Sequence, residues 1–342
     1  MRVIVLLLLL TLLPKAAATD EIAVTVYNSN IGVVSETRQL EFKEGVGRLA
    51  FRDVPSRIDA ASVRFKVPGS KVSILEQNYA FDLVSPTKMY LKYIDKKIEL
   101  IDKEGRLYDG ELLAYANGSV TLRESNGRIK IVLLENVIEV NFPRLPEGLI
   151  TRPTLFWLYN SGETGRLNCN VGYQTGGLNW SAEYVGLLDG DEQMLDLSGW
   201  ASINNVSGKT YKDAKLKLIA GDISRAMPPP PHALNGMAMA RTSAAKGFEE
   251  KTFFEYHLYT LPRKTTLADK EIKQVSLFEP ASTSVTKTFT YFPDQHPTNV
   301  EVGVKFENSA PAGLGMPLPA GRLRMFKADE DGSMILLGED FI

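Results

Sequence analysis

Alternation of apolar and polar side chains is the dominant pattern along the chain. It is clearest in residues 215–220, 254–258 and 299–307, where every second side chain is apolar. A period of two is that of a β-strand, in which successive side chains point to opposite faces. No long stretch after the N-terminal segment follows a helical period, and Gly, Pro, Asn and Asp separate the short strands. The pattern predicts an all-β protein built around an antiparallel β-sandwich.

The strand pattern divides the chain into three regions. Residues 19–87 form an N-terminal β region, and residues 150–342 predict a larger β-sandwich domain. Between them, residues 88–145 hold about five short strands joined by glycine-bearing turns, a pattern typical of tightly connected hairpins. A strongly bent sheet of that size predicts a small SH3-like or Sm-like barrel.

One segment of the predicted sandwich breaks the alternation. Residues 224–250 contain four consecutive prolines followed by an Ala-, Gly-, Ser- and Met-rich stretch. Proline cannot donate to a central sheet, so this segment predicts a long flexible Pro-rich surface loop. Its methionines suggest a contact segment for a partner as the alternative.

The first 18 residues have the features of a secretory signal peptide. Arg2 precedes a mostly aliphatic run from Val3 to Leu13, and three alanines end at Ala18. That run has 11 residues, short of the roughly 20 that span a bilayer as a helix. Small residues before a cleavage site are typical of signal peptides. We predict cleavage after Ala18, a periplasmic or secreted protein, and no integral membrane span.

Charge and cysteine content exclude several classes of partner and site. The 39 basic and 41 acidic residues nearly balance, so the chain has no basic field for nucleic acid. Cys169 is the only cysteine, which excludes an intrachain disulfide and a thiolate metal cluster. In its strand-like context it predicts a small core residue rather than a nucleophile.

Two short motifs resemble ligand-binding signatures. Gly45–Ala50, "GVGRLA", matches a dinucleotide fingerprint, but the residues that follow alternate like a strand, which favours a hairpin turn. Asp329 and Asp331 have the spacing of an EF-hand loop, although Lys327 and Gly338 stand where that loop needs carboxylates. Here too a hairpin turn, closed by Asp331 and Gly332, is the better interpretation.

The residues that catalysis most often uses form no recognisable motif. His232, His257 and His296 are scattered over a proline-rich loop, a strand and a turn. No catalytic, cofactor-binding or metal residue is therefore assigned, and no cofactor is expected. The acidic run at residues 188–196 suggests either a cation site or a solvated turn, and we favour the turn. Paired carboxylates on separate strands stay open, because their spacing is spatial.

The three tryptophans have two possible roles. Exposed tryptophan rings stack on sugars, whereas tryptophans on strands more often anchor a core. We expect Trp157, Trp180 and Trp200 to be core residues.

Three segments together resemble a known family: residues 152–188, 197–222 and 321–340. They contain a Tyr173–Trp180–Tyr184 arrangement, an N-x-x-G turn at residues 205–208, and a closing G-R-x-R, D-x-D-G and G-E-D series. In this order they look like the bacterial domain of unknown function 4139 family, which includes mucoidy-inhibitor-like exported proteins. The resemblance implies a β-rich exported protein without an assigned reaction. We interpret the matching residues as structural: Trp180, Tyr184, Asn204, Asn205 and Gly208.

The same resemblance gives an expectation for the end of the chain. Such proteins continue with further strands, whereas this chain stops at Ile342. We therefore expect a shortened final sandwich with an exposed edge at residues 334–337. The predicted function is an exported, non-catalytic binding or scaffold module of the cell envelope, with an envelope protein or glycan as partner. The alternative is a hydrolase of envelope polysaccharide or peptide that uses carboxylates from separate strands.

Overall fold

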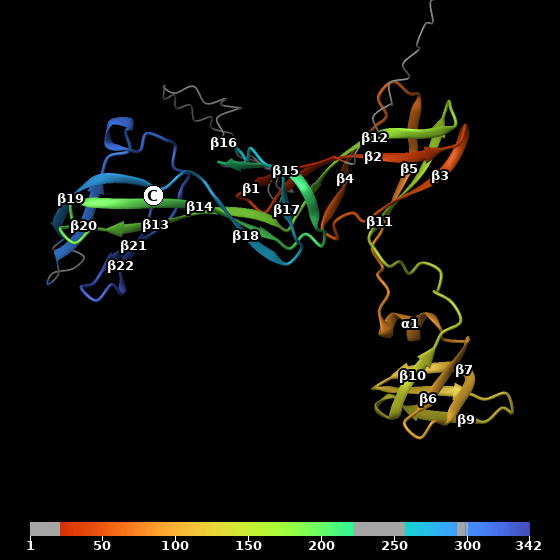
Figure 1. Cartoon of the computed structure of the whole chain (residues 1–342). Helices are drawn as coiled ribbons and strands as arrows, with labels where there is room; N and C mark the ends of the chain where they lie inside the picture. The colour runs from red at the N-terminus through yellow and green to blue at the C-terminus, as the bar shows by residue number, and fades with distance from the viewer. Residues whose placement is uncertain (1–20, 222–256, 293–297, 299) are drawn as a thin grey trace, which may run out of the picture. The chain divides into compact units, whose positions relative to one another are not determined.

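The computed structural model describes residues 21–221, 257–292, 298 and 300–342 (Figure 1). These residues form an all-β, sandwich-like protein with one short α-helix, which confirms the predicted class. The predicted signal peptide, residues 1–18, and the predicted loop, residues 224–250, lie outside the described residues. No helix in the described part is long and apolar enough to cross a bilayer.

The chain forms two compact units and passes between them four times, after Glu41, Ser56, Ser70 and Thr164. The first unit consists of Met1–Glu41, Arg57–Ser70 and Gly165–Ile342, and the second of Phe42–Ser56 and Lys71–Thr164. The predicted regions 19–87 and 150–342 are thus interleaved, because strands from one pair with strands from the other. Sequence proximity does not show such long-range pairing.

The first unit contains two seven-stranded sheets. The first, here the β1 sheet, has the order β16-β15-β1-β2-β12-β4, and β17 also pairs with β15. Its strands are β1 (Glu21–Tyr27), β2 (Gly32–Phe42), β4 (Ile58–Lys66), β12 (Gly165–Thr175), β15 (Tyr211–Ala220), β16 (His257–Thr260) and β17 (Thr265–Leu267).

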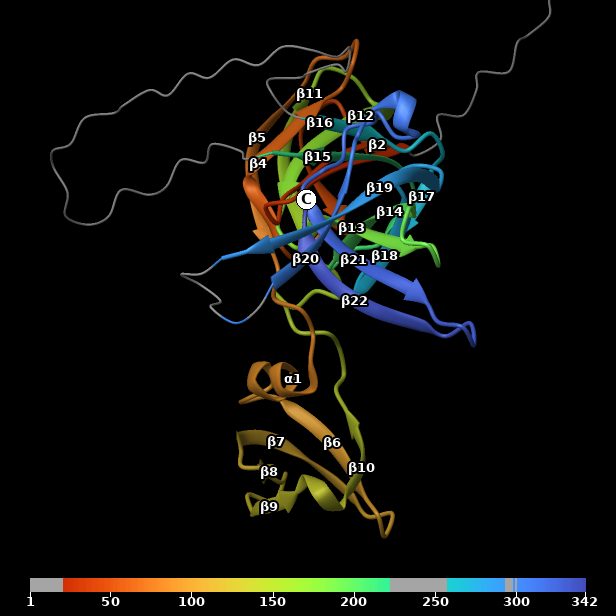
Figure 2. The same ribbon diagram turned by 90° about the vertical axis from the view of Figure 1, so that its left-hand side faces the viewer.

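The second, here the β13 sheet, has the order β20-β19-β14-β13-β21-β22, and β18 also pairs with β14. Its strands are β13 (Leu178–Leu188), β14 (Met194–Asn205), β18 (Glu271–Ser276), β19 (Ala281–Tyr291), β20 (Val300–Phe306), β21 (Gly321–Ala328) and β22 (Met334–Phe341). A 3-10 turn, η2 (Ala310–Ala312), lies between β20 and β21. The β21–β22 hairpin, drawn in dark blue, ends the sheet (Figure 2).

Two strand pairs differ from the predicted antiparallel arrangement. β1 and β15 are parallel, with Val24 opposite Leu216, and β13 and β21 are parallel, with Tyr184 opposite Leu323. Both pairs join segments that are far apart in the sequence, as parallel strands require a long crossover connection. Alternation within a strand carries no information about the direction of its neighbour, so this feature was not predictable.

The second unit contains two smaller sheets. The β11 sheet joins β3 (Gly45–Arg52), β11 (Thr154–Ser161) and β5 (Val72–Ala80) in that order. The β6 sheet has the antiparallel order β10-β6-β7-β8-β9. Its elements are α1 (Pro86–Lys92), β6 (Lys97–Asp102), β7 (Leu107–Ala116), β8 (Ser119–Arg123), β9 (Ile129–Leu133), the 3-10 turn η1 (Leu134–Asn136) and β10 (Val137–Asn141).

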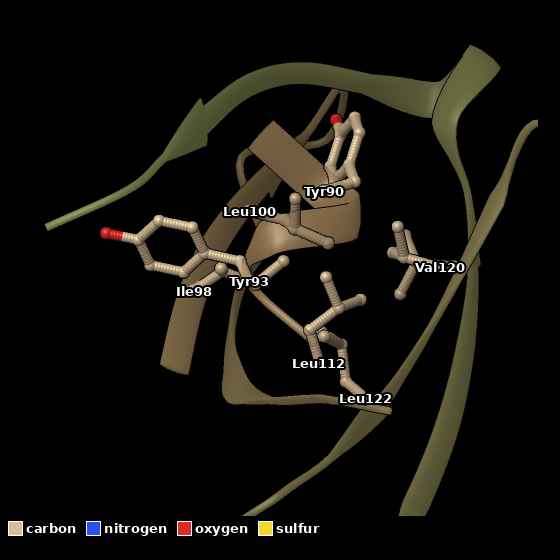
Figure 3. Close-up of a cluster of buried hydrophobic side chains, with 8 residues drawn as sticks. Tyr90, Tyr93, Ile98, Leu100, Leu112, Val120 and Leu122 are labelled. Carbon is tan, nitrogen blue, oxygen red and sulfur yellow. The ribbon is translucent and has the colours of Figure 1, made fainter. Parts of the chain in front are cut away.

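The β6 sheet has a hydrophobic core of its own (Figure 3). Tyr90 of α1 and Tyr93 at its end lie over buried aliphatic side chains of the sheet: Ile98, Leu100, Leu112, Val120 and Leu122. Ser85 caps α1 by accepting a hydrogen bond from the Lys88 amide at 3.3 Å, which satisfies one of the free N–H groups of the first turn. The five strands predicted within residues 88–145 therefore pack as one module.

Candidate functional site

A groove of about 400 Å³ opens on one face of the β13 sheet. Five strands contribute to its wall, among them both edge strands of the sheet, β20 and β22. The apolar side chains that form it include Leu188, Val302, Val304, Phe306, Leu323 and Leu337. Because the two edges of one sheet line the same groove, the sheet curls around it. The volume lies within the ~300–1,000 Å³ that small-ligand sites occupy.

The alternation in β20 builds one wall of this groove. β20 pairs with β19 so that Val302 lies opposite Phe289 and Val304 opposite Lys287. Directly opposed side chains point to the same face of a sheet. Val302 nevertheless keeps 58% of its surface exposed and Phe289 keeps 67%. The alternating apolar stripe that predicted this strand therefore lines an open groove.

The other wall includes β22, in which every residue is exposed. β22 pairs with β21 and stands at the end of the sheet path. The expected edge at residues 334–337 is therefore observed, and Met334, Ile335, Leu336 and Leu337 each expose about half of their surface. Contiguous exposed apolar surface of this kind marks interaction sites more often than it marks idle surface.

Ion pairs at the rim neutralise most of its charge. Glu192 accepts hydrogen bonds from Lys287 at 2.6 Å and from Lys327 at 2.8 Å, and the two lysines lower the pKa of Glu192 to about 2. Glu339 pairs with Arg324 at 2.8 Å. Asp340, which also lines the groove, accepts a hydrogen bond from the Phe341 amide at 2.8 Å and forms no ion pair with any described residue. Asp340 is thus the groove-lining carboxylate that has no cationic partner among the described residues.

A second cluster, centred on the buried carboxylate of Glu36, lies in the β1 sheet. The Glu36 carboxylate accepts hydrogen bonds from Lys209 Nζ at 2.5 Å, Arg38 Nε at 2.8 Å and the Tyr173 hydroxyl. Burial raises the pKa of Glu36, but Lys209 and Arg38 outweigh burial and hold that pKa below its usual value of 4.5. Burial and the adjacent Glu36 carboxylate raise the pKa of Tyr173 well above its usual value of 10.0, so this hydroxyl stays a donor.

The Glu36 cluster has no access for a ligand. The side chains of Glu36 and Lys209 are 0% and 3% exposed, and the carboxylate already accepts hydrogen bonds from three side chains. A buried charge is tolerated when it is paired and hydrogen-bonded in this way. Sequence analysis missed this cluster, although a signal existed: Glu36 interrupts the apolar face of a strand that includes Val34. We interpret the cluster as a structural lock.

The turn that delivers Lys209 confirms the structural interpretation of the N-x-x-G motif. Asn205 Nδ2 donates to the carbonyls of Lys209 at 2.9 Å and Leu267 at 3.1 Å, and its Oδ1 accepts from the Ser207 hydroxyl at 2.7 Å. Gly208 has φ +86°, a left-handed conformation that favours glycine. The motif fixes a buried turn and contributes no free functional group.

The candidate nucleophile and bases are not brought together in the described residues. Cys169 is fully buried, and burial raises the pKa of its thiol to about 12, which confirms a core role. His257 lies at the exposed start of β16. His232 and His296 lie outside the described residues.

The tryptophans divide into two groups. Trp157 and Trp180 are buried, as predicted, and each indole N–H donates a hydrogen bond: to Gln77 Oε1 at 2.7 Å and to the Ile219 carbonyl at 2.9 Å. Trp200 differs from the prediction, because 39% of its surface is exposed on β14. On the same strand, Leu197 and Ala201 lie on the opposite, buried face. The burial of each tryptophan therefore depends on which face of its strand it occupies.

Two of the three turn predictions are confirmed, and the third is wrong. The acidic run at 188–196 joins β13 and β14, and Asp189 Oδ1 accepts from the amides of Gln193 at 2.8 Å and Met194 at 3.0 Å. In the final hairpin the Gly332 amide donates to the Asp329 carbonyl at 2.9 Å. The predicted hairpin turn at Gly45–Ala50 is wrong: these residues form the start of strand β3, which pairs with β11 and not with the preceding strand β2. The strand continues to Arg52 and no helix follows it directly. Neither "GVGRLA" nor "DEDG" therefore has the structural context of its ligand-binding motif.

Comparisons with known proteins add no relative. The chain matches no protein-family model, and neither the curated proteins nor the solved structures with which it was compared contain a match.

Proposed function

We propose that this chain is an exported, non-catalytic binding module of the cell envelope, and that the groove of the β13 sheet is its binding surface. The observation that carries the proposal is the exposure of apolar side chains on both edge strands of one curled sheet. Val302 and Leu337 line the groove from opposite edges and each leave more than half of their surface in water. At ~25 cal/mol per Å² of apolar surface, covering such a groove is a substantial driving force for binding.

The charges in the groove support binding rather than hydrolysis. Glycoside hydrolysis needs one carboxylic acid whose pKa is raised so that it can protonate the leaving group. Each described carboxylate with a shifted pKa has that pKa lowered, and the groove residue among them, Glu192, is ion-paired with two lysines. This arrangement keeps the Glu192 carboxylate ionised and held in place by its two lysine partners.

The N-terminal sequence and the family resemblance support the cellular part of the proposal. The aliphatic run and the alanines before Thr19 have the pattern of a cleaved leader. The resemblance to the domain of unknown function 4139 family likewise implies an exported β-rich protein. N-terminal sequencing of the chain recovered from a bacterial periplasm should begin at Thr19; an intact Met1 on cytoplasmic protein would contradict export.

The groove itself can be tested with bis-ANS, a dye whose fluorescence rises on apolar protein surfaces. The variant Val302→Lys places a charge at the rim and should reduce the dye signal strongly. Val46→Lys is the matched control, because Val46 is also an exposed strand valine, at 66%, but belongs to β3 in the other unit. Equal dye binding by the two variants would contradict the groove as the binding surface. Circular dichroism melting curves check that both variants fold.

A further inference from the structure

We propose that the groove receives an extended segment of a partner protein, which adds to β22 as a further strand and carries a basic side chain toward Asp340. This inference rests on the proposed function and specifies its ligand. It is derived from three features of the β22 edge: its backbone groups, its apolar wall and its charge.

The backbone of β22 offers a strand-pairing edge. Ile342 and Gly321 exchange both of their backbone hydrogen bonds, each at 3.0 Å. In an antiparallel pair such residues alternate with residues whose N–H and C=O groups point the other way. The backbone groups of Glu339 and Phe341 therefore point to the open edge. No described strand pairs with this edge of β22, and a strand edge without a neighbour is a template for an added strand.

The apolar wall determines which side chains an added strand would carry. Side chains of a strand alternate between its two faces, so every second residue of the added segment would point into the groove. The groove floor is aliphatic, with Leu188 and Leu323 largely buried beneath the exposed rim residues Val302 and Leu337. A segment with apolar residues at every second position would cover this wall, whereas a polar chain such as a glycan would leave its apolar side chains exposed to water.

The charges that line the groove favour a basic residue at one end of the bound segment. The groove is lined by Glu192, Glu339 and Asp340 against the single lysine Lys287. Glu192 and Glu339 already have cationic partners, so Asp340 is the carboxylate that a ligand can pair with. In the free chain Asp340 accepts from the Phe341 amide, one of the edge donors. A strand carbonyl that takes over this N–H releases the carboxylate for a lysine or arginine of the partner.

Fluorescence anisotropy with the purified full chain can test the proposal. The probe is a short fluorescein-labelled peptide in which valine and threonine alternate, with lysine at one end. A second peptide has the same sequence with alternate amide nitrogens methylated, which removes strand pairing and keeps the side chains. Methylation should weaken binding by at least about tenfold, because several backbone hydrogen bonds are lost. Val302→Lys should abolish binding, and Val46→Lys should leave it unchanged.

A charge exchange tests the role of Asp340. Replacing the peptide lysine by glutamate should weaken binding by about five-fold, and the variant Asp340→Lys should reverse that preference. A preference that stays the same in Asp340→Lys overturns the charge assignment. Light scattering at the same protein concentrations reports self-association, and a dimer that excludes the peptide overturns the partner assignment in favour of a second copy.

The result also separates this inference from the proposed function. Bis-ANS binding that depends on Val302, together with no difference between the plain and the methylated peptide, overturns strand addition and leaves the groove as a site for another apolar ligand. Loss of the Val302 dependence overturns both.

Discussion

Strands β15 and β20 carry the same alternation but differ in burial. In β15, Leu216 is 1% exposed, whereas in β20, Val302 is 58% exposed. β15 pairs with β1 on one side and with β16 and β17 on the other, and its apolar face belongs to the core. β20 pairs with β19 and stands at the sheet edge. Alternation therefore specifies which face of a strand is apolar. The place of the strand in the folded sheet decides whether that face is buried.

The charges near the two strands differ in the same way. Lys209, just before β15, is buried and forms an ion pair with the buried Glu36 carboxylate. Lys287, opposite β20, pairs with Glu192 at a solvated rim where both side chains remain partly exposed. A buried pair costs several kcal/mol to break, and an exposed pair contributes little. The comparison predicts which substitutions destabilise the protein and which alter only its surface.

The largest effect is expected for Glu36→Gln. This change removes the Glu36 charge from the buried ion pair with Lys209 and should lower the free energy of unfolding by about 3–5 kcal/mol. Urea denaturation followed by far-UV circular dichroism measures the loss. The double variant Glu36→Leu, Lys209→Met removes both charges and should recover most of it. A single variant as stable as the wild type would contradict the structural lock.

The next largest effect is a difference in unfolding free energy between the variants Leu216→Ala and Val302→Ala. Leu216→Ala removes a buried side chain in β15 and should destabilise by about 2–5 kcal/mol. Val302→Ala changes an exposed rim residue and should stay within about 0.5 kcal/mol of the wild type. The same denaturation experiment measures both. Equal destabilisation by the two changes would mean that the groove is part of a closed core.

The smallest effect concerns pH. The folded-state pKa of Glu36 is below its usual value of 4.5, so its contribution is fully present above that pH and is lost as pH falls through the folded value. The free energy of unfolding should therefore decline below about pH 4.5. Glu192→Gln should leave most of this decline in place, because Glu192 lies at an exposed rim. The decline should flatten in the Glu36→Leu, Lys209→Met variant; an unchanged slope there would assign it to other carboxylates.

Particular residues show which features could be predicted from the sequence and which could not. The hairpin at Asp331–Gly332, the core role of Cys169 and the strand at β15 follow from local chemistry and were predicted. The Glu36–Lys209 pair was not, because its partners are separated by 173 residues and meet only when β2 and the turn before β15 come together. The exposure of Trp200 was also missed, since the alternation does not say which face of β14 is covered.

The sequence by itself determined that the chain forms β-strands, where most of the turns between strands lie, and which face of each strand is apolar. Those features depend on side-chain period and turn chemistry, which are local. Only the tertiary structure decided which stripe is buried, which strands are parallel, and that β20 and β22 line one groove. These depend on pairing between distant segments, because a strand's own residues fix its two faces but not the neighbour that covers either of them.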